Sequence, residues 1–491
     1  MMYMIRVCYR CPMIVFLLFP TMGSADSDHE LNTHYEKGRA AALKHEYDRA
    51  IAEFTEVVRL DPKQFNVYNF RAYAYLAKGE YTKAIDDYTT FLRRNHANSD
   101  AFRCRGTAYL CKGEFEKAHV DFNQALQLDS KNHIAYYSRG LYYARHCEND
   151  KAIADFSSAI SLAPPIASYF SARAVSYYAE GDYDKAIADS NRAIQLDPKD
   201  AEAFYCRGFA HRSKGEYNKA IADISKAIHL NPKDSQSYYN RGLCYRLRGE
   251  YDKAIADYTE AIHLDPEKAV VYDDRGFCYL MRGMYDKACA DYTEAIRLSP
   301  TIAGAYCNRG FCFLMNNKYD KAIADYSKAI RLDPKNSDTY CDRGLTYHEI
   351  GNYNKAMSDY SEAIRLSPKS PKPYCCRAWT LATCSLSKLR NGEKAVLDAS
   401  KACELSAWKD PVCLACLAAS YAEMSDFKAA VKSQNQVVEI LSESAPEEKL
   451  AIAREHLSRY QNGKPLRGSR FPAFGIEIKV LQKKEKTRKN R

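Results

Sequence analysis

The stretch RGEYDKAIADYTEAIHLDP at residues 248–266 recurs almost unchanged further along the chain. It returns as RGMYDKACADYTEAIRLSP at 282–300 and as KYDKAIADYSKAIRLDP at 318–334. Equivalent prolines therefore stand 34 residues apart, at Pro266, Pro300 and Pro334. A fixed period of this size indicates stacked supersecondary units that share one continuous core. The 491 residues are consequently expected to form one solenoid and not several globular domains.

Each repeat contains two segments with the periodicity of an amphipathic helix. In the first, SQSYYNRGLCYRLR at 235–248, the residues Tyr238, Gly242 and Tyr245 fall on one face. In the second, Ala254 begins a run of small and apolar residues at helical spacing, and Pro266 ends the helix. Small residues such as Gly242 and Ala254 allow the two backbones to approach closely. Each unit is therefore predicted to be a helical hairpin.

The order aromatic, Gly, Tyr, Ala, aromatic, Ala and Pro within each unit resembles the tetratricopeptide repeat (TPR), whose period is also 34. The resemblance covers residues 31–444 and implies an all-α, right-handed superhelical solenoid of about twelve helical hairpins. The repeats begin near Leu31, Phe65, Ser99, His133, Ala167, Ala201, Ser235, Ala269, Ala303, Ser337, Pro371 and Pro411.

The C-terminal part of the array departs from the regular period. Ala378 and Ala395 are 17 residues apart where earlier repeats have 12, so about five residues are inserted around CSLSKLRNG. The neighbouring stretch NGEKAVLDASKACELSAWKDP is similar to C-terminal modules of exported bacterial TPR proteins. We therefore expect a solenoid over residues 26–444, followed by a capping helix over 445–460 that covers its open end.

The first 25 residues have the layout of a secretory signal peptide. Arg6 and Arg10 precede a short apolar run, and Gly-Ser-Ala precedes Asp26. The run is too short to span a membrane comfortably, so no transmembrane anchor is expected once it is removed. The sequence thus predicts export to the periplasm or the extracellular space. The alternative is an apolar N-terminus that is never cleaved.

The formal charge of +10 is concentrated at the two ends of the chain. Residues 1–25 contribute +2 and residues 461–491 contribute +8, which leaves the solenoid neutral. The basic tail at 461–491 is expected to be disordered because its end has no apolar periodicity. It could contact polyanions weakly, or it could serve only as a solubilising terminus.

Two charged positions recur in step along the repeats. Arginine occupies one first-helix position at residues 71, 105, 139, 173, 207, 241, 275, 309, 343 and 377. Aspartate occupies one second-helix position at residues 87, 121, 155, 189, 223, 257, 291, 325, 359 and 398. The first repeat exchanges both, to Lys37 and Glu53, and the twelfth loses both, to Leu417 and Ser433. Because the two positions change together, we predict that Arg and Asp form an ion pair between packed helices. The alternative is a stripe of arginines that binds phosphates, but the matching aspartates would cancel its positive charge.

No nucleotide-binding, nucleophile-elbow or zinc-protease motif occurs, and the carboxylates repeat as a lattice instead of forming one unique cluster. The sequence therefore predicts neither an enzyme nor a cofactor or metal site.

Sixteen of the 18 cysteines follow residue 25, and Cys244, Cys278 and Cys312 share one position. Equivalent positions on neighbouring helices lie about 8–10 Å apart, beyond disulfide reach, so buried apolar cysteines are expected. Cys413 and Cys416 are spaced as in the C-x-x-C motifs of redox and metal-binding sites, and such a site is the alternative interpretation of these two cysteines.

The TPR resemblance implies that the first helices line a concave face on which partners dock. The residues placed there are Tyr239, Leu243, Phe277, Leu280, Met281, Phe311, Leu314 and Met315. Packing between repeats is the competing interpretation of these side chains. The Lys and Asn pattern of chaperone-binding TPR domains is not visible in successive first helices.

The sequence therefore predicts a non-enzymatic scaffold that binds a protein or peptide partner outside the cytoplasm. One alternative is a nucleic-acid, polyanion or cell-surface binding factor that acts through its basic tail, with the solenoid as a spacer. Another is an accessory subunit of an envelope enzyme complex.

Overall fold

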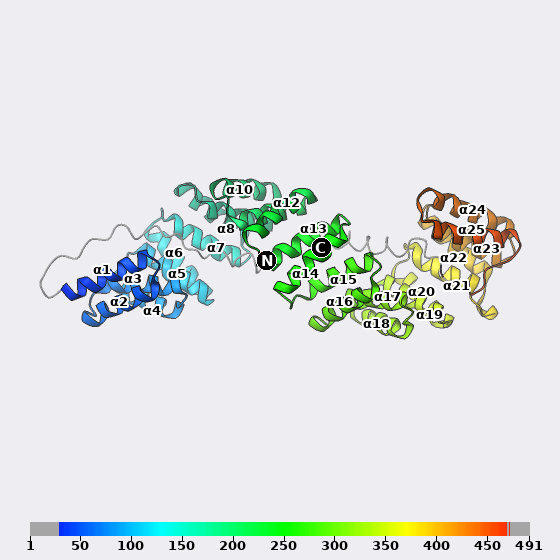
Figure 1. Ribbon diagram of the computed structural model, residues 1–491, viewed down its shortest axis with the longest axis horizontal. Helices are drawn as coiled ribbons and strands as arrows, with labels where there is room; N and C mark the ends of the chain where they lie inside the picture. Colours follow the sequence, from blue (N-terminus) through cyan, green and yellow to red (C-terminus); the bar gives the residue numbers. More distant parts are fainter. Residues whose placement is uncertain (1–28, 469–470, 472–491) are drawn as a thin grey trace. The chain divides into compact units, whose positions relative to one another are not determined.

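The computed structural model describes residues 29–468 and residue 471, and all regular secondary structure within them is helical. Consecutive helices pair as antiparallel hairpins, each packed against the next within its unit (Figure 1). The predicted all-α architecture of stacked hairpins is confirmed. The signal-like residues 1–25 and the tail beyond residue 471 lie outside the described part of the chain.

The chain divides into two compact units, Met1–Arg248 and Gly249–Arg491. The helices of the first unit are α1 (His29–Leu43), α2 (Tyr47–Leu60), α3 (Phe65–Lys78), α4 (Tyr81–Leu92), α5 (Ser99–Lys112), α6 (Phe115–Leu128), α7 (His133–Arg145), α8 (Asn149–Leu162), α9 (Ala167–Ala179), α10 (Tyr183–Leu196), α11 (Ala201–Ser213), α12 (Tyr217–Leu230) and α13 (Ser235–Leu247).

The helices of the second unit are α14 (Tyr251–Leu264), α15 (Ala269–Met281), α16 (Tyr285–Leu298), α17 (Ala303–Met315), α18 (Tyr319–Leu332), α19 (Ser337–Glu349), α20 (Tyr353–Leu366), α21 (Pro371–Thr383), η1 (Ser387–Leu389), α22 (Gly392–Leu405), α23 (Pro411–Glu423), α24 (Phe427–Ser444) and α25 (Glu447–Gln461). The inserted residues of the eleventh repeat form the short 3-10 helix η1 between α21 and α22.

Local residues explain where the helices begin and end. The side chains of Asn98 and Asp200 accept hydrogen bonds from backbone N–H groups in the first turns of α5 and α11. Gly79 and Gly113 end α3 and α5 with φ of 85° and 86°, a left-handed conformation that suits glycine. The left-handed residue recurs every 34 residues from His45 to Gly351, so the helical register follows the sequence period, whereas side-chain caps are absent from first helices such as α9 and α15.

A glycine in the first helix lets the two helices of a hairpin approach closely. A Cβ added at Gly140 would lie 2.6 Å from the ring of Phe156, and one at Gly344 would lie 2.6 Å from the ring of Tyr360. Both rings are fully buried. Since a methyl group would clash there, the small residues expected between the backbones are required by the packing.

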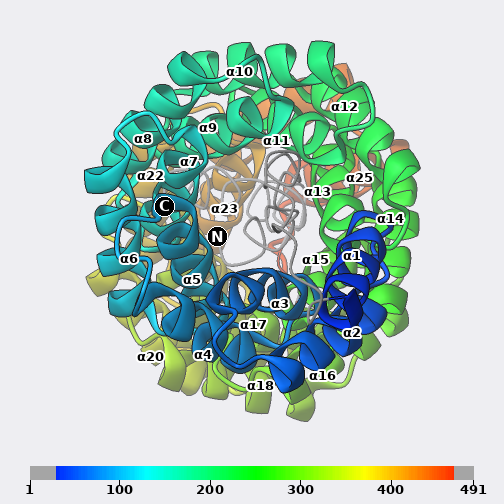
Figure 2. The ribbon, with the colours of Figure 1, turned by 90° about the vertical axis from the view of Figure 1, so that its left-hand side faces the viewer.

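The first helices form the inner side of each unit. Within each unit, a second helix packs against the first helices that precede and follow it, as α10 does with α9 and α11, and the consecutive first helices α9 and α11 also contact one another. In the first unit, Figure 2 shows α6, α8 and α10 on the outer side of α5, α7 and α9. We call the surface formed by the first helices the inner surface.

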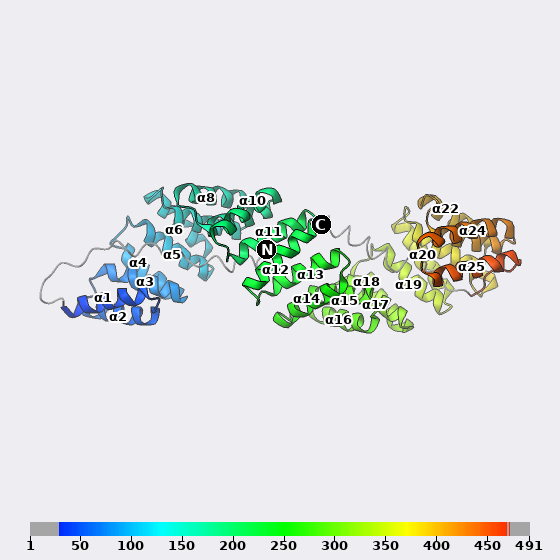
Figure 3. The same ribbon diagram turned by 45° about the horizontal axis from the view of Figure 1, so that its top comes forward.

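The C-terminal end of the second unit is closed by α24 and α25. These two helices lie side by side (Figure 3), and Gln434 of α24 donates a hydrogen bond to the carbonyl of Ala453 in α25 at 2.9 Å. Leu450, Ala453 and Tyr460 of α25 are buried in the same core as Trp379 of α21. The last helix thus covers apolar surface that a further repeat would cover elsewhere in the array.

Candidate partner-binding surface

The eight residues predicted to face a partner lie on three first helices. Tyr239 and Leu243 belong to α13 in the first unit, and both are half-buried. The other six are the ninth, twelfth and thirteenth residues of α15 and α17 in the second unit. Leu243 is also a ninth residue, whereas Tyr239 is the fifth residue of α13, so seven of the eight residues share one repeated set of positions on the inner surface.

These six positions differ in how much surface they leave open. Phe277 and Leu280 are only 7% and 5% exposed, and Leu280 belongs to a core with Tyr292 and Cys312. Phe311 packs against that core and remains half-buried. Met281, Leu314 and Met315 are half-buried as well. Phe277 and Leu280 thus contribute mainly to packing, while the half-buried residues retain surface for a partner.

A segment that the sequence did not single out lies on the same surface near the C-terminus. We call residues 465–468 together with Phe471 the docked segment. Leu466 is 3% exposed and belongs to the core that includes Trp379. The ring of Phe471 lies 6.1 Å from that of Trp379 in an edge-to-face arrangement. The prediction of disorder from Gln461 onward is therefore wrong at Gln461, which belongs to α25, and at Leu466, whose side chain is buried.

The docked segment occupies positions equivalent to the predicted site. Trp379, Ala382 and Thr383 are the ninth, twelfth and thirteenth residues of α21, as Phe311, Leu314 and Met315 are of α17. The N–H of Gly468 donates to the carbonyl of Thr383 at 2.7 Å. The inner surface therefore holds a non-helical chain segment in at least one place.

A carboxylate anchors the basic residue of the docked segment. Glu423, the last residue of α23, lies with Oε2 2.5 Å from Nη1 of Arg467. Its other oxygen accepts a hydrogen bond from Nε of Arg390 at 3.0 Å. The Glu423 side chain is only 13% exposed, and each oxygen of this largely buried carboxylate faces one arginine.

Nine of the ten predicted Arg–Asp ion pairs are present within the two units. Each arginine binds both carboxylate oxygens of the aspartate in its own repeat, as in Arg309 and Asp325, where the distances are 2.7 and 2.9 Å. The pairs are 71–87, 105–121, 139–155, 173–189, 207–223, 275–291, 309–325, 343–359 and 377–398. Arg241 and Asp257 belong to different units.

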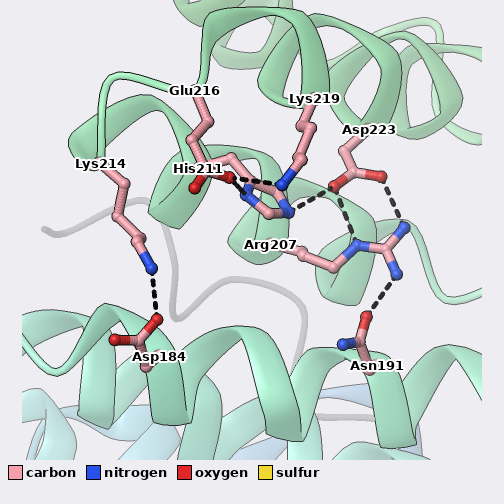
Figure 4. A network of polar contacts seen from close by, with 8 residues as sticks. All are labelled: Asp184, Asn191, Arg207, His211, Lys214, Glu216, Lys219 and Asp223. Carbon is pink, nitrogen blue, oxygen red and sulfur yellow. Dashed lines mark hydrogen bonds and ion pairs between the residues drawn. The ribbon is translucent and has the colours of Figure 1, made fainter.

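A third partner of each arginine, which the sequence analysis missed, joins neighbouring repeats. Arg207 binds Asp223 and also donates from Nη1 to the side chain of Asn191, 16 residues earlier, at 2.6 Å (Figure 4). Arg309 donates in the same way to Thr293. The sequence contained a signal for this contact, because Thr, Asn or Ser stands 16 residues before every one of these arginines.

Aromatic rings flank the same arginines. The guanidinium of Arg309 lies 5.7 Å from the ring of Tyr306 and 5.8 Å from that of Phe313. Each guanidinium nitrogen of Arg309 thus already donates to a side chain of the protein, which argues against the phosphate-gripping interpretation. The first repeat departs from the expected pair, since Glu53 lies 2.6 Å from Nδ1 of His34.

The cysteines are mostly buried free thiols, as predicted. Of the sixteen in the described residues, only Cys147 is exposed, and Cys111 and Cys289 are half-buried. Cys375 and Cys413 lie on successive first helices with their sulfurs 3.1 Å apart. The sequence analysis compared only equivalent positions and therefore missed this contact between the fifth residue of α21 and the third of α23.

Burial gives the thiols a testable pH dependence. It raises the pKa of Cys206 and of Cys403 to about 12, and that of Cys416 to about 11. A raised pKa in the folded state stabilises the fold below pH about 9, and this contribution is lost as pH rises from 9 toward 12. We expect the urea midpoint to fall between pH 8 and 10.5, and Cys206→Ala to reduce that fall. An equal fall in this variant would contradict the prediction.

The described residues contain neither a metal-binding cluster nor a membrane-spanning helix. In the described part of the chain, no group of three or more His, Cys, Asp or Glu side chains is arranged to hold a metal ion. None of the helices between residues 29 and 461 has the length and apolar character needed to cross a membrane.

Comparison with family models identifies the repeats. Models of the tetratricopeptide repeat match residues 35–100, 201–234, 235–268, 269–302, 303–336 and 326–357. A model described as TPR repeat matches residues 106–146, 175–212 and 344–382. Together these matches cover more than half of the chain. The chain belongs to the tetratricopeptide repeat family. A search of curated proteins found no match for this TPR protein.

Solved structures of other proteins resemble parts of the TPR array. YrrB, a TPR protein with an unusual peptide-binding site, is 22% identical, with 38% of this chain and 95% of YrrB covered and a TM-score of 0.35. A tetratricopeptide repeat protein from Parabacteroides merdae is 23% identical, with 50% and 98% covered and a TM-score of 0.38. Yeast Tom70 is 19% identical, with 93% and 99% covered and a TM-score of 0.36. Because these TM-scores are low, the family assignment rests on the repeat matches.

Proposed function

We propose that this TPR protein is a non-enzymatic scaffold that binds an extended segment of a protein partner on its inner surface, outside the cytoplasm. The observation that carries the proposal is the docked segment on α21 and α23, because it lies at the positions that Phe311, Leu314 and Met315 occupy on α17.

The half-buried residues of α17 are suited to anchor a partner. Phe311 supplies aromatic area, and Met315 has a flexible side chain that adapts to irregular surfaces. Phe277 and Leu280 hold the neighbouring backbone in place from within the core. Since a few buried anchors carry most of the energy of an interface, these side chains should dominate binding.

The proposal of export is supported by the composition of residues 1–25, in which two arginines precede an apolar run and small residues precede Asp26. A partner encountered there would share the periplasmic or extracellular compartment.

One experiment tests binding and location together. The protein is crosslinked in intact cells of its source, purified, and analysed by mass spectrometry for partners and for its own N-terminus. We expect an N-terminus near Asp26, and at least tenfold less partner captured by Phe311→Ser combined with Met315→Ser. Leu397→Ser is the matched control, because Leu397 is an exposed apolar residue on the second helix α22, with 74% of its surface open.

Unchanged capture by the double variant would contradict binding at α17, and an N-terminus at Met1 with cytosolic recovery would contradict export.

The +8 charge of residues 461–491 supports polyanion binding by the tail as the second candidate function. Capture that weakens steeply with added salt would favour the tail, because charge-driven binding to a polyanion releases counterions.

A further inference from the structure

The docked segment satisfies backbone groups that a helix end leaves open. The last four carbonyls of an α-helix have no partner within the helix. In α21, the carbonyls of Thr380 and Leu381 accept from the N–H groups of Cys384 and Asn391. The carbonyl of Thr383 accepts from Gly468, and that of Ala382 lies 3.5 Å from Nη1 of Arg467. The segment therefore supplies the donors for the final two carbonyls.

The same place has a negative potential that selects a cation. The C-terminus of a helix carries a partial negative charge, and α21 and α23 both end beside Arg467. Glu423 adds a full negative charge in the last turn of α23, where a carboxylate is unfavourable without a cationic partner. Arg390 binds only one of the two carboxylate oxygens, Oε1, and leaves Oε2 for another donor. A second arginine is thus the complementary ligand for this site.

An aromatic pocket lies further along the segment. Phe471 packs edge-to-face on Trp379 and against the cluster that contains Tyr360 and Cys376. Met357 packs against that cluster as well. The arginine and the aromatic ring stand four residues apart in the sequence, with a glycine directly after the arginine. Gly468 has φ of 60°, a conformation that most other residues adopt only with strain.

We propose that the inner surface at α21 and α23 is an exchangeable peptide-binding site whose resident ligand is the docked segment. A protein partner replaces that ligand with an extended segment carrying the pattern apolar residue, Arg, Gly, two further residues and an aromatic residue. This rests on the proposed function, because it assigns a ligand chemistry to the inner surface. Exchange is feasible because the docked segment is short and non-helical, and its residues Arg467 and Gly468 are exposed.

Tethering determines how the site responds to a competitor. The docked segment follows α25 directly, so its effective concentration at the site is on the order of millimolar. A free peptide of the same sequence must compete with this concentration in the wild-type chain. It meets no such competition in a chain whose own segment has lost its two anchors.

The test uses the full-length chain and a fluorescent peptide of residues 463–471, GKPLRGSRF. We expect this peptide to bind the Arg467→Glu, Phe471→Ser chain at least tenfold more tightly than it binds the wild-type chain. A peptide with the same two changes should not bind. Lys464→Glu is the matched control, because it reverses a charge on an exposed residue of the same stretch and should leave the wild-type response unchanged.

A second measurement avoids any risk that the variant is misfolded. In the wild-type chain, millimolar unlabelled peptide should accelerate hydrogen exchange of residues 464–468, because it displaces them. No binding to a variant of normal helicity, or unchanged exchange, would overturn the proposal. A wild-type dimer that Phe471→Ser dissolves would overturn it in favour of a second copy of the chain. All these results are independent of Phe311, so they separate this site from the one at α17.

Discussion

Replacing Asp325 with serine is expected to lower the free energy of unfolding of the second unit by about 3 kcal/mol, because it leaves the charge of Arg309 largely buried without its counterion. The two side chains are only 10% and 16% exposed. Arg309→Leu alone should be destabilising for the same reason, since it strands Asp325. The chain itself suggests the matched double variant, because the twelfth repeat carries Leu417 and Ser433 at these two positions.

The Arg309→Leu, Asp325→Ser chain should therefore lose less stability than the sum of the two single changes. Thermal melts followed by circular dichroism give the three differences needed for a double-mutant cycle. A coupling of more than about 1 kcal/mol is expected, because the two residues share a bidentate contact. Additive losses would show that the pair does not act as a unit.

Replacing Phe277 with serine is expected to destabilise the second unit by about 3–5 kcal/mol, as large-to-small core substitutions do. Phe277 is 7% exposed, and its ring lies 6.5 Å from that of Tyr251. Phe311→Ser is the matched control, since it makes the same chemical change at the equivalent position of the next repeat, where the ring is half-buried.

The Phe311→Ser chain should melt closer to the wild type and should lose partner capture instead. Melts of both variants beside the capture experiment distinguish packing from binding at these positions. A Phe277→Ser chain that melts like the wild type would show that this ring faces a partner and does not belong to the core.

Much of the candidate site could be read from the repeat period. The positions of Phe311, Leu314 and Met315 follow from helical spacing, because every first helix presents its ninth, twelfth and thirteenth residues in the same direction. The difference in burial between Phe277 and Phe311 could not be read in this way. It depends on the side chains that neighbouring repeats place around each ring, and these vary while the period does not.

The sequence by itself determined the hairpin register, the Arg–Asp pairs and the buried cysteine positions. All three depend on contacts between residues at constant separations, such as the 16 residues between Arg309 and Asp325, so one period describes them all. Only the tertiary structure revealed the docked segment and the contact of Cys375 with Cys413. Arg467 reaches the carbonyl of Ala382 across 85 residues. No local pattern encodes such a contact, because it forms only where the ends of α21 and α23 bring unpaired carbonyls and Glu423 together.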